Sequence, residues 1–116
     1  MFIRFSHVML STPQLDNSVN WYCEKLDFKV VDHSPGAFAS LYHPQVGKLT
    51  LHSTQDLSQI GKGPVPYLLV EEIRESINEL RLKIIHVSDP RREGSSPWFA
   101  DFKDLDGNVW GLEEQA

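Results

Sequence analysis

Residues 102–114, FKDLDGNVWGLEE, decide the fold of this chain. Their centre, DLDGN at 104–108, predicts a turn, because Asp and Asn side chains bond the backbone locally and Gly107 accepts a positive φ without steric cost. Apolar residues stand on both sides of this turn, which is typical of a β-hairpin. We therefore expect strands over 98–103 and 108–113, joined by this turn.

The composition of the chain restricts its class. Its 116 residues imply one domain or two very small modules sharing a core, and 41% hydrophobic with 23% charged residues is ordinary for a globular protein. The net charge of −5 argues against general nucleic-acid binding and tolerates cationic ligands. No apolar run approaches the roughly 18 residues that a membrane span needs, so we expect no membrane association.

The single cysteine, Cys23, cannot form an internal disulfide, so a reducing cytoplasm is the simplest location. The N-terminal residues MFIRFSHVML lack the small-residue cleavage site of a signal peptide and are interpreted as a first strand over 2–12. Cys23 falls on the apolar face of the helix that follows, where we expect a small buried hydrophobe and not a reactive thiol.

In the first half of the chain, apolar positions at helical spacing predict a helix over 15–26. Asp16 or Ser11 is expected to cap its start, and Asp27 to end it with a positive φ. Three strands are expected to follow, over 28–33, 37–43 and 48–53. In the last of them, Leu49 and Leu51 alternate with Lys48, Thr50 and His52, which predicts two different faces.

The second half repeats this order. A polar linker over 55–64 is followed by a predicted strand over 65–70, a helix over 71–82, and strands over 84–87, 98–103 and 108–113, with a polar loop over 89–97. The order is βαβββ twice, with a period of about 58 residues. We therefore predict an α+β fold of two tandem βαβββ modules, about 1–54 and 65–116, in a single domain. The helices would cover the outer faces and leave the inner faces to line a pocket.

Several short motifs in this order resemble the vicinal-oxygen-chelate superfamily, which includes glyoxalase I, the bleomycin-resistance proteins and the extradiol dioxygenases. The matching residues are His7-Val8-Met9-Leu10, Ser18-Val19-Asn20-Trp21-Tyr22, Leu26-Asp27-Phe28-Lys29-Val30-Val31 and the hairpin Asp104-Leu105-Asp106-Gly107-Asn108. The chain departs from the family pattern with Trp21 as the aromatic before Tyr22, Asp27 for Gly and Leu105 for Pro. The resemblance implies a curved, incomplete barrel and a homodimer with the ligand site near the interface.

Metal-using members of that family place carboxylate, Gln or His ligands on four strands around one cavity. His7 stands where the first ligand often stands, and the second falls on the face of Lys48, Thr50 and His52. The third falls near Val65, where there is no His or carboxylate, and the fourth falls at Gly111, where Glu is usual. A Lys cannot ligate and a Thr hydroxyl is a poor ligand, so we expect no metal.

One shifted site remains an alternative. His7, His52 and Glu113 would form a 2-His-1-carboxylate set, which is a recognised iron(II) arrangement. A metal-dependent lyase or dioxygenase using these residues is therefore the alternative function. No catalytic triad or paired acid is evident, and whether the chain is an enzyme stays open at this point.

The preferred interpretation is a cavity that binds an aromatic or cationic small molecule without a metal, similar to the bleomycin-resistance proteins. Aromatic side chains stack on flat or cationic ligands. Gly111 would remove a side chain from the cavity wall. The candidate ligand-binding residues are His7, Phe38, Tyr42, Thr50, His52, Tyr67, Trp98 and Gly111, with Phe99 as a further aromatic candidate. A degenerate scaffold kept for protein contacts is a third hypothesis.

Overall fold

The computed structural model describes all 116 residues and shows two compact units, Met1–Lys62 and Gly63–Ala116. Their boundary falls inside the polar stretch 55–64 that the sequence predicts as a linker. Each unit contains one long helix and one mixed β-sheet, so the α+β class with two βαβββ-like modules is confirmed. No helix has the length and apolar content needed to cross a membrane.

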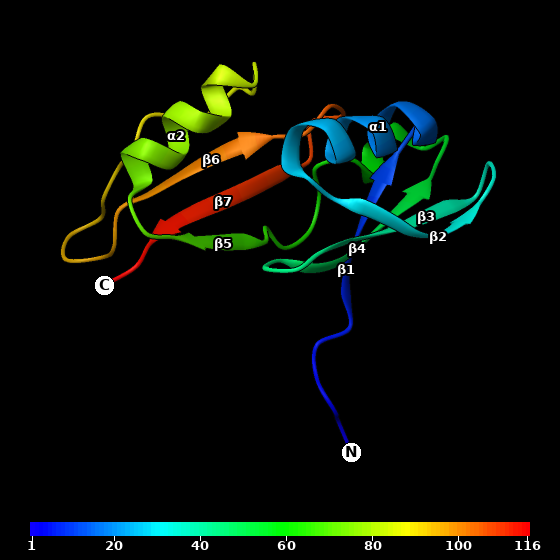
Figure 1. Cartoon of the computed structure of the whole chain (residues 1–116), viewed down its shortest axis with the longest axis horizontal. Coiled ribbons are helices and arrows are strands. Elements are labelled where there is room, and N and C mark those ends of the chain that lie inside the picture. The colour runs from blue at the N-terminus through cyan, green and yellow to red at the C-terminus, as the bar shows by residue number, and fades with distance from the viewer. The chain divides into compact units, whose positions relative to one another are not determined.

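The first unit is a four-stranded sheet with a helix on one face (Figure 1). The strands lie in the order β1-β4-β3-β2, with β1 parallel to β4 and the other pairs antiparallel. Its elements are β1 (His7–Thr12), α1 (Leu15–Leu26), β2 (Lys29–Ser34), β3 (Phe38–His43), β4 (Gly47–Ser53) and the short 3-10 helix η1 (Leu57–Gln59).

The core of this unit lies between α1 and the sheet. Tyr22 on α1 is fully buried, as are Leu41 on β3 and Leu51 on β4. These leucines alternate along their strands with residues of the opposite face, so one face carries the core and the other is left without a covering helix. The predicted alternation of β4, with Leu49 and Leu51 against Lys48, Thr50 and His52, is confirmed.

The predicted start of α1 is wrong, although its range is correct. The N-cap residue is Gln14, without a side-chain cap, so neither Asp16 nor Ser11 has that role. Instead the hydroxyl of Thr12 accepts the N–H of Gln14 and shares a buried hydrogen bond of 2.9 Å with Ser18. The predicted end is confirmed, because Asp27 lies in the left-handed region at φ 60°.

The predicted first strand over 2–12 is too long. β1 begins at His7, which pairs with Lys48, and β4 itself begins one residue earlier at Gly47. Residues 2–6 therefore have no strand beside them to pair with. Phe2, Ile3 and Phe5 in this segment are 93%, 91% and 78% exposed.

The second unit repeats the arrangement with a three-stranded sheet in the order β5-β7-β6 (Figure 1). β5 is parallel to β7, as β1 is parallel to β4, and β6 is antiparallel to β7. Its elements are β5 (Tyr67–Val70), α2 (Ile73–Leu82), β6 (Phe99–Lys103) and β7 (Val109–Glu114).

The predicted strand over 84–87 does not form. Ile84 takes a left-handed φ of 61°, which an extended strand cannot contain, and only isolated bridges Val87↔Phe102 and Arg91↔Phe99 follow. These bridges place the segment beside β6, in the position that β2 occupies beside β3. The second module is therefore βαβββ-like, with an irregular last element of its sheet.

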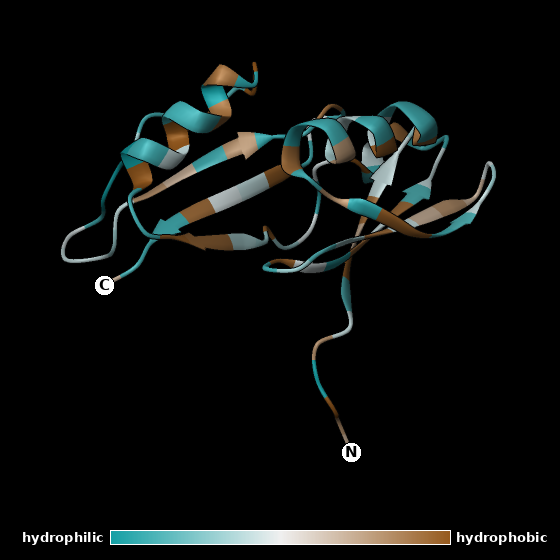
Figure 2. Cartoon of the chain, in the orientation of Figure 1, coloured by the Kyte–Doolittle hydropathy of each residue, from teal (hydrophilic) through white to brown (hydrophobic).

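Hydrophobic positions recur along α2 between hydrophilic ones (Figure 2). Ile73 and Ile77 are each 2% exposed, as is Trp110 on β7, and the Trp110 ring stacks on that of Phe102 with centroids 6.3 Å apart. Trp110 thus lies beneath a helix, since it is buried and α2 packs on β7.

The hairpin at 104–108 forms as predicted. The carboxylate of Asp104 is buried and accepts hydrogen bonds from the backbone N–H groups of Asp106 and Asn108, both at 2.9 Å, and from the Asn108 amide at 3.1 Å. Gly107 has φ 96°, a conformation that glycine adopts without steric cost, which explains why glycine occupies this position. This turn joins β6 to β7 and sets their register, which brings Gly111 opposite Asp101.

Candidate functional site

The helix-free face of the first unit holds all the candidate ligand-binding residues predicted there. The register places His7, Lys48 and Tyr42 in one row across β1, β4 and β3. A second row contains Thr50 and Ser40, whose hydroxyls share a hydrogen bond of 3.1 Å, and a third contains His52 and Phe38. His7, Phe38, Tyr42, Thr50 and His52 therefore share one face, as the alternation predicts.

A pocket of about 590 Å³ lies at the His7 end of this face. It is lined by Ile3, Arg4, Phe5, Ser6, Tyr42, Gly47 and Lys48. The Ser6 hydroxyl shares a hydrogen bond of 2.9 Å with Nδ1 of His7. The N-terminal segment thus supplies one wall of the pocket, a role that its interpretation as a strand did not predict.

His7 and His52 lie at opposite ends of the same face. His7 pairs with Lys48, four residues before His52, which puts the two histidines about 13 Å apart along the strand direction. Side chains stand roughly perpendicular to a sheet, so imidazoles this far apart do not converge on one ion. This separation removes the geometric basis of the 2-His-1-carboxylate alternative.

In the second unit, Tyr67 and Gly111 are direct partners across β5 and β7. A Cβ atom at position 111 would lie within 2.6 Å of the Tyr67 ring. The expectation that Gly111 leaves free space in the wall is therefore wrong, because the Tyr67 ring occupies that space. The ring itself remains accessible, since Tyr67 is 53% exposed.

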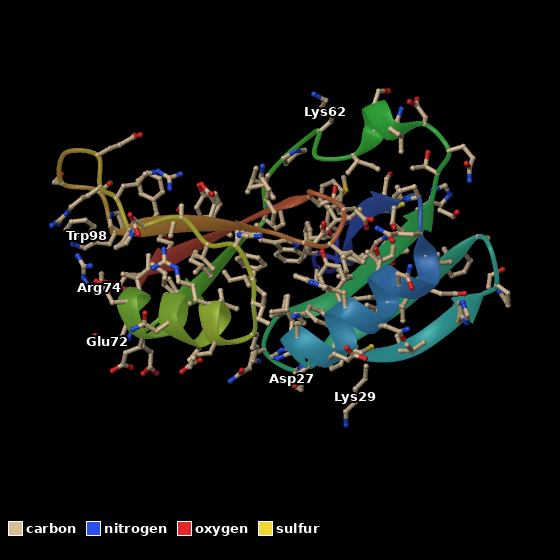
Figure 3. All side chains as sticks on the ribbon, turned by 90° about the horizontal axis from the view of Figure 1, so that it is seen from above. Asp27, Lys29, Lys62, Glu72, Arg74 and Trp98 are labelled. Carbon is tan, nitrogen blue, oxygen red and sulfur yellow. The ribbon has the colours of Figure 1, made fainter.

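Trp98 does not lie with these residues. It precedes β6, so it faces the side opposite to Phe99, and the guanidinium of Arg74 on α2 lies 5.8 Å from the centroid of its ring (Figure 3). The guanidinium of Arg92 lies 5.5 Å from the same centroid. The structure thus places the Trp98 ring beside two guanidinium groups, one of them on α2, and its role in ligand binding stays a prediction. Phe99, by contrast, shares the open face with Glu113.

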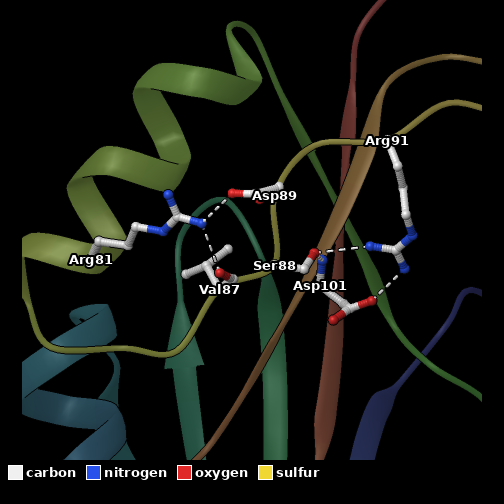
Figure 4. A network of polar contacts seen from close by, with 6 residues as sticks. All are labelled: Arg81, Val87, Ser88, Asp89, Arg91 and Asp101. Carbon is white, nitrogen blue, oxygen red and sulfur yellow. Dashed lines mark hydrogen bonds and ion pairs between the residues drawn. The ribbon is translucent and has the colours of Figure 1, made fainter.

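The loop over 89–97 is held against β6 (Figure 4). The guanidinium of Arg91 forms an ion pair with Asp101, donates to the Ser88 hydroxyl at 2.9 Å and lies 4.5 Å from the centroid of the Phe99 ring. Asp101 stands opposite Gly111 on the open face. Sequence reasoning missed this network, because a loop arginine and a strand aspartate ten residues apart give no periodic signal.

The residues at the four metal-ligand positions do not fit a divalent cation. The parallel pair β1–β4 brings His7 opposite Lys48, and the equivalent pair β5–β7 brings Tyr67 opposite Gly111. Tyr67, and not a residue near Val65, is thus the partner of the fourth position. An ammonium has no lone pair, glycine has no side chain, and a neutral phenol is a weak ligand. Within neither unit do three His, Cys, Asp or Glu side chains form a group that could hold a metal.

No covalent catalyst is evident either. Cys23 is half-buried on α1, and burial, followed by the charge of Glu24, raises the pKa of its thiol. A raised pKa keeps the thiol protonated, which makes it a poor nucleophile. Cys23 is not among the buried residues of α1, so the expected burial of this side chain is confirmed only in part.

Comparison with protein families gives one match that spans most of the chain. The model of the Glyoxalase/Bleomycin resistance protein/Dioxygenase superfamily matches residues 4–112. A search of curated proteins finds no match.

Solved structures share the fold at low sequence identity. UcmS2 superposes with a TM-score of 0.80 at 22% identity, covering 99% of this chain and 100% of UcmS2. TnmS3, an antibiotic binding protein from Streptomyces sp. CB03234, gives 0.72 at 22% identity with the same coverage. A mutant of FosX, the fosfomycin resistance protein of Listeria monocytogenes, complexed with Mn(II), gives 0.79 at 12% identity, covering 100% of this chain and 95% of FosX. At these identities the likeness establishes the fold alone.

Proposed function

Because the chain belongs to the glyoxalase/bleomycin resistance protein/dioxygenase superfamily, we propose that it binds a small aromatic molecule without a metal. The ligand would lie on the helix-free sheet faces. TnmS3, whose fold is similar, is an antibiotic binding protein, which makes an antibiotic one candidate ligand. No reaction is assigned to the chain.

The observation that carries this proposal is the exposure of aromatic rings on a face whose reverse is fully packed. Tyr42 is 45% exposed and borders the pocket of about 590 Å³, while Leu41 beside it is 0% exposed on the core side. This volume lies within the usual range for small-molecule sites, about 300–1,000 Å³. Exposed rings with polar neighbours such as Thr50 and His52 provide stacking area and hydrogen bonds for orientation.

The donor set supports the metal-free part of the proposal. His7 is the only imidazole or carboxylate in the two cross-strand pairs His7–Lys48 and Tyr67–Gly111. Of the two ligand classes that the sequence suggests, aromatic or cationic, the rings favour the aromatic one. The basic side chains at the pocket disfavour a cation.

As part of the same proposal, the chain forms a homodimer through the open faces of its sheets. The apolar residues left exposed on these faces support this: Met9 is 63%, Tyr67 53% and Leu69 68% exposed. A face of this kind is normally covered by a partner or a ligand.

Thermal denaturation with a panel of planar aromatic compounds tests the proposal. A ligand present at 100 times its Kd stabilises the folded state by about 2.7 kcal/mol, which raises the Tm measurably. We expect at least one compound to raise the Tm of the parent chain and to raise that of Tyr42→Ala much less. Leu105→Ala, which removes an exposed apolar side chain from the hairpin, is the control and should respond like the parent. A scaffold kept only for protein contacts would show no shift with any compound.

Elemental analysis tests the metal-free part separately. Protein purified without chelator should contain far less than one equivalent of iron, zinc, nickel or manganese per chain. About one equivalent, lost in His7→Ala, would favour the metal-dependent lyase or dioxygenase instead.

A further inference from the structure

Cationic side chains gather at one end of the open face in the first unit, although the chain as a whole carries a net charge of −5. The row across the strands is His7, Lys48, Tyr42 and Lys29, from β1 to β2. Arg4 lines the same pocket as Lys48 and Tyr42. No carboxylate lines this pocket, and Asp32, the acidic residue on this part of the face, stands in the next row opposite Ser40.

These cations have no protein counter-charge. The arginines that form ion pairs, Arg81 with Asp89 and Arg91 with Asp101, both lie in the second unit. Neither Arg4 nor Lys48 forms an ion pair. Directly opposed side chains on neighbouring strands have Cβ atoms about 4.5–5.5 Å apart, so Lys48 and Lys29 each stand next to Tyr42 from opposite sides. An unpaired cluster of like charges beside a hollow is a surface that an anion would stabilise.

Three carboxylates border a different hollow. The pocket of about 690 Å³ in the second unit is lined by Asp101, Asp104 and Asp106, together with His86 and Lys103. Charge is thus unevenly distributed, and the net charge of the chain does not describe the pocket beside Tyr42. The expectation of a cationic ligand, which rested on that net charge, does not hold for this pocket.

We propose that the ligand of this protein carries an anionic group that Lys48 and Arg4 bind, while its apolar part lies against the rings of Tyr42 and Phe5. A carboxylate, phosphate or sulfonate on a flat ring system meets this description, because each accepts charge-assisted hydrogen bonds from ammonium and guanidinium groups. Lys48 stands opposite His7 across β1 and β4, so its ammonium supplies positive charge at the pocket. This inference rests on the proposed function and specifies its ligand class.

A pair of fluorescent probes that differ by one charged group tests the inference. 8-Anilinonaphthalene-1-sulfonate carries the anion, and N-phenyl-1-naphthylamine is the same ring system without it. We expect the full chain to bind the sulfonate more tightly than the neutral amine, with an affinity that falls as salt is raised. Lys48→Gln and Arg4→Gln should each weaken sulfonate binding by roughly tenfold, the usual value of one charge-assisted hydrogen bond, and leave the neutral probe within about twofold.

Lys62→Gln, which removes an exposed lysine from the loop between the units, is the matched control and should bind both probes like the parent (Figure 3). Unchanged sulfonate affinity in Lys48→Gln would overturn the inference. Equal affinity of the parent for both probes would also overturn it, while leaving the proposed binding function intact. Absence of binding by both probes and by every aromatic compound in the thermal panel would overturn the proposed function as well.

Discussion

Gly111 and Tyr67 face each other across β7 and β5, and the lack of a side chain at position 111 leaves room for the Tyr67 ring. The Tyr67 ring lies over the glycine so closely that any β-carbon at position 111 would collide with it. Alternation along β7, counted from the hairpin turn, correctly predicts that Gly111 lies on the open face of the sheet. It does not predict the ring above it, because a cross-strand neighbour depends on register and not on sequence distance.

This packing predicts that the effect of Gly111→Ala on stability changes sign when the Tyr67 ring is removed. In the parent chain, Gly111→Ala should destabilise by about 1–3 kcal/mol, or displace the Tyr67 ring, since extra atoms enter an occupied space. In a Tyr67→Ala background the same change should be neutral or stabilising by up to about 1 kcal/mol, because glycine is unfavourable inside a strand. Urea unfolding of the four proteins of this double-mutant cycle measures both values.

Gly47→Ala provides a contrast, because a β-carbon there would meet no neighbouring atom but its φ of 101° disfavours any side chain. It should destabilise equally with or without the Tyr67 ring. If Gly111→Ala also cost the same in both backgrounds, the ring would not be the cause of its effect.

At the scale of the elements, the 3.6-residue periodicity of α1 predicts its full range, Leu15–Leu26, because a one-sided apolar stripe is a local signal. The start of the helix is not predicted. The Thr12 hydroxyl, on β1, accepts the N–H of Gln14 and bonds the Ser18 hydroxyl on α1, whereas the sequence contains several equally suitable caps nearby. The predicted strand over 84–87 does not form for a related reason. Its β-branched residues favour a strand, but the tight turn at Ile84 after α2 prevents regular strand pairing.

The start of α2 depends on another element in the same way. The carboxylate of Glu114, on β7, accepts the backbone N–H of Ile73 at 3.0 Å, whereas the N-cap residue Glu72 provides no side-chain cap. A carboxylate at a helix N-terminus accepts a free donor and interacts favourably with the helix dipole. Strand β7 thus helps to fix the start of α2, the helix that covers its sheet.

We therefore expect Glu114→Ala to destabilise the chain by about 0.5–2 kcal/mol, the usual cost of losing an N-terminal cap. Glu114→Gln should cost less, because the amide keeps an oxygen acceptor but loses the charge. Glu113→Ala, the adjacent exposed carboxylate on the open face, is the matched control and should change stability by no more than about 0.5 kcal/mol. Urea unfolding followed by far-UV circular dichroism measures all three, and equal effects of Glu113→Ala and Glu114→Ala would contradict the capping role.

At the scale of the whole molecule, the repeat of two βαβββ-like modules follows from the order of sequence patterns, and the structure confirms it. The faces of the sheets are also predictable, since alternation along each strand separates Leu49 and Leu51 from Thr50 and His52. The charge around the pocket is not predictable, because Lys48 and Lys29 are brought to either side of Tyr42 by strand pairing, and Arg4 reaches the pocket from the segment before β1.

The exposed apolar residues of the open faces lead to a prediction about assembly. Leu69 on β5 is 68% exposed and stands opposite Glu113 on the same face as Tyr67. If a second copy of the chain covers this face, as we propose, the parent should elute at twice the mass of its 13.3 kDa chain in size-exclusion chromatography with light scattering. Leu69→Glu should weaken the dimer at least tenfold, because a charge in a desolvated interface core costs more than about 1.4 kcal/mol.

Leu82→Glu is the matched control for this experiment. Leu82 is 85% exposed, but it lies at the end of α2, on the element that covers the opposite face of the sheet. Because the same charge at that position stays in water, the variant should remain dimeric with parent affinity. A monomeric parent chain at micromolar concentration would contradict the dimer, and dissociation by Leu82→Glu alone would place the interface on the helices. In either case the aromatic faces of the sheets would be free to take up ligand within a single chain. For a monomeric parent, the thermal shifts produced by the aromatic panel would also be independent of protein concentration.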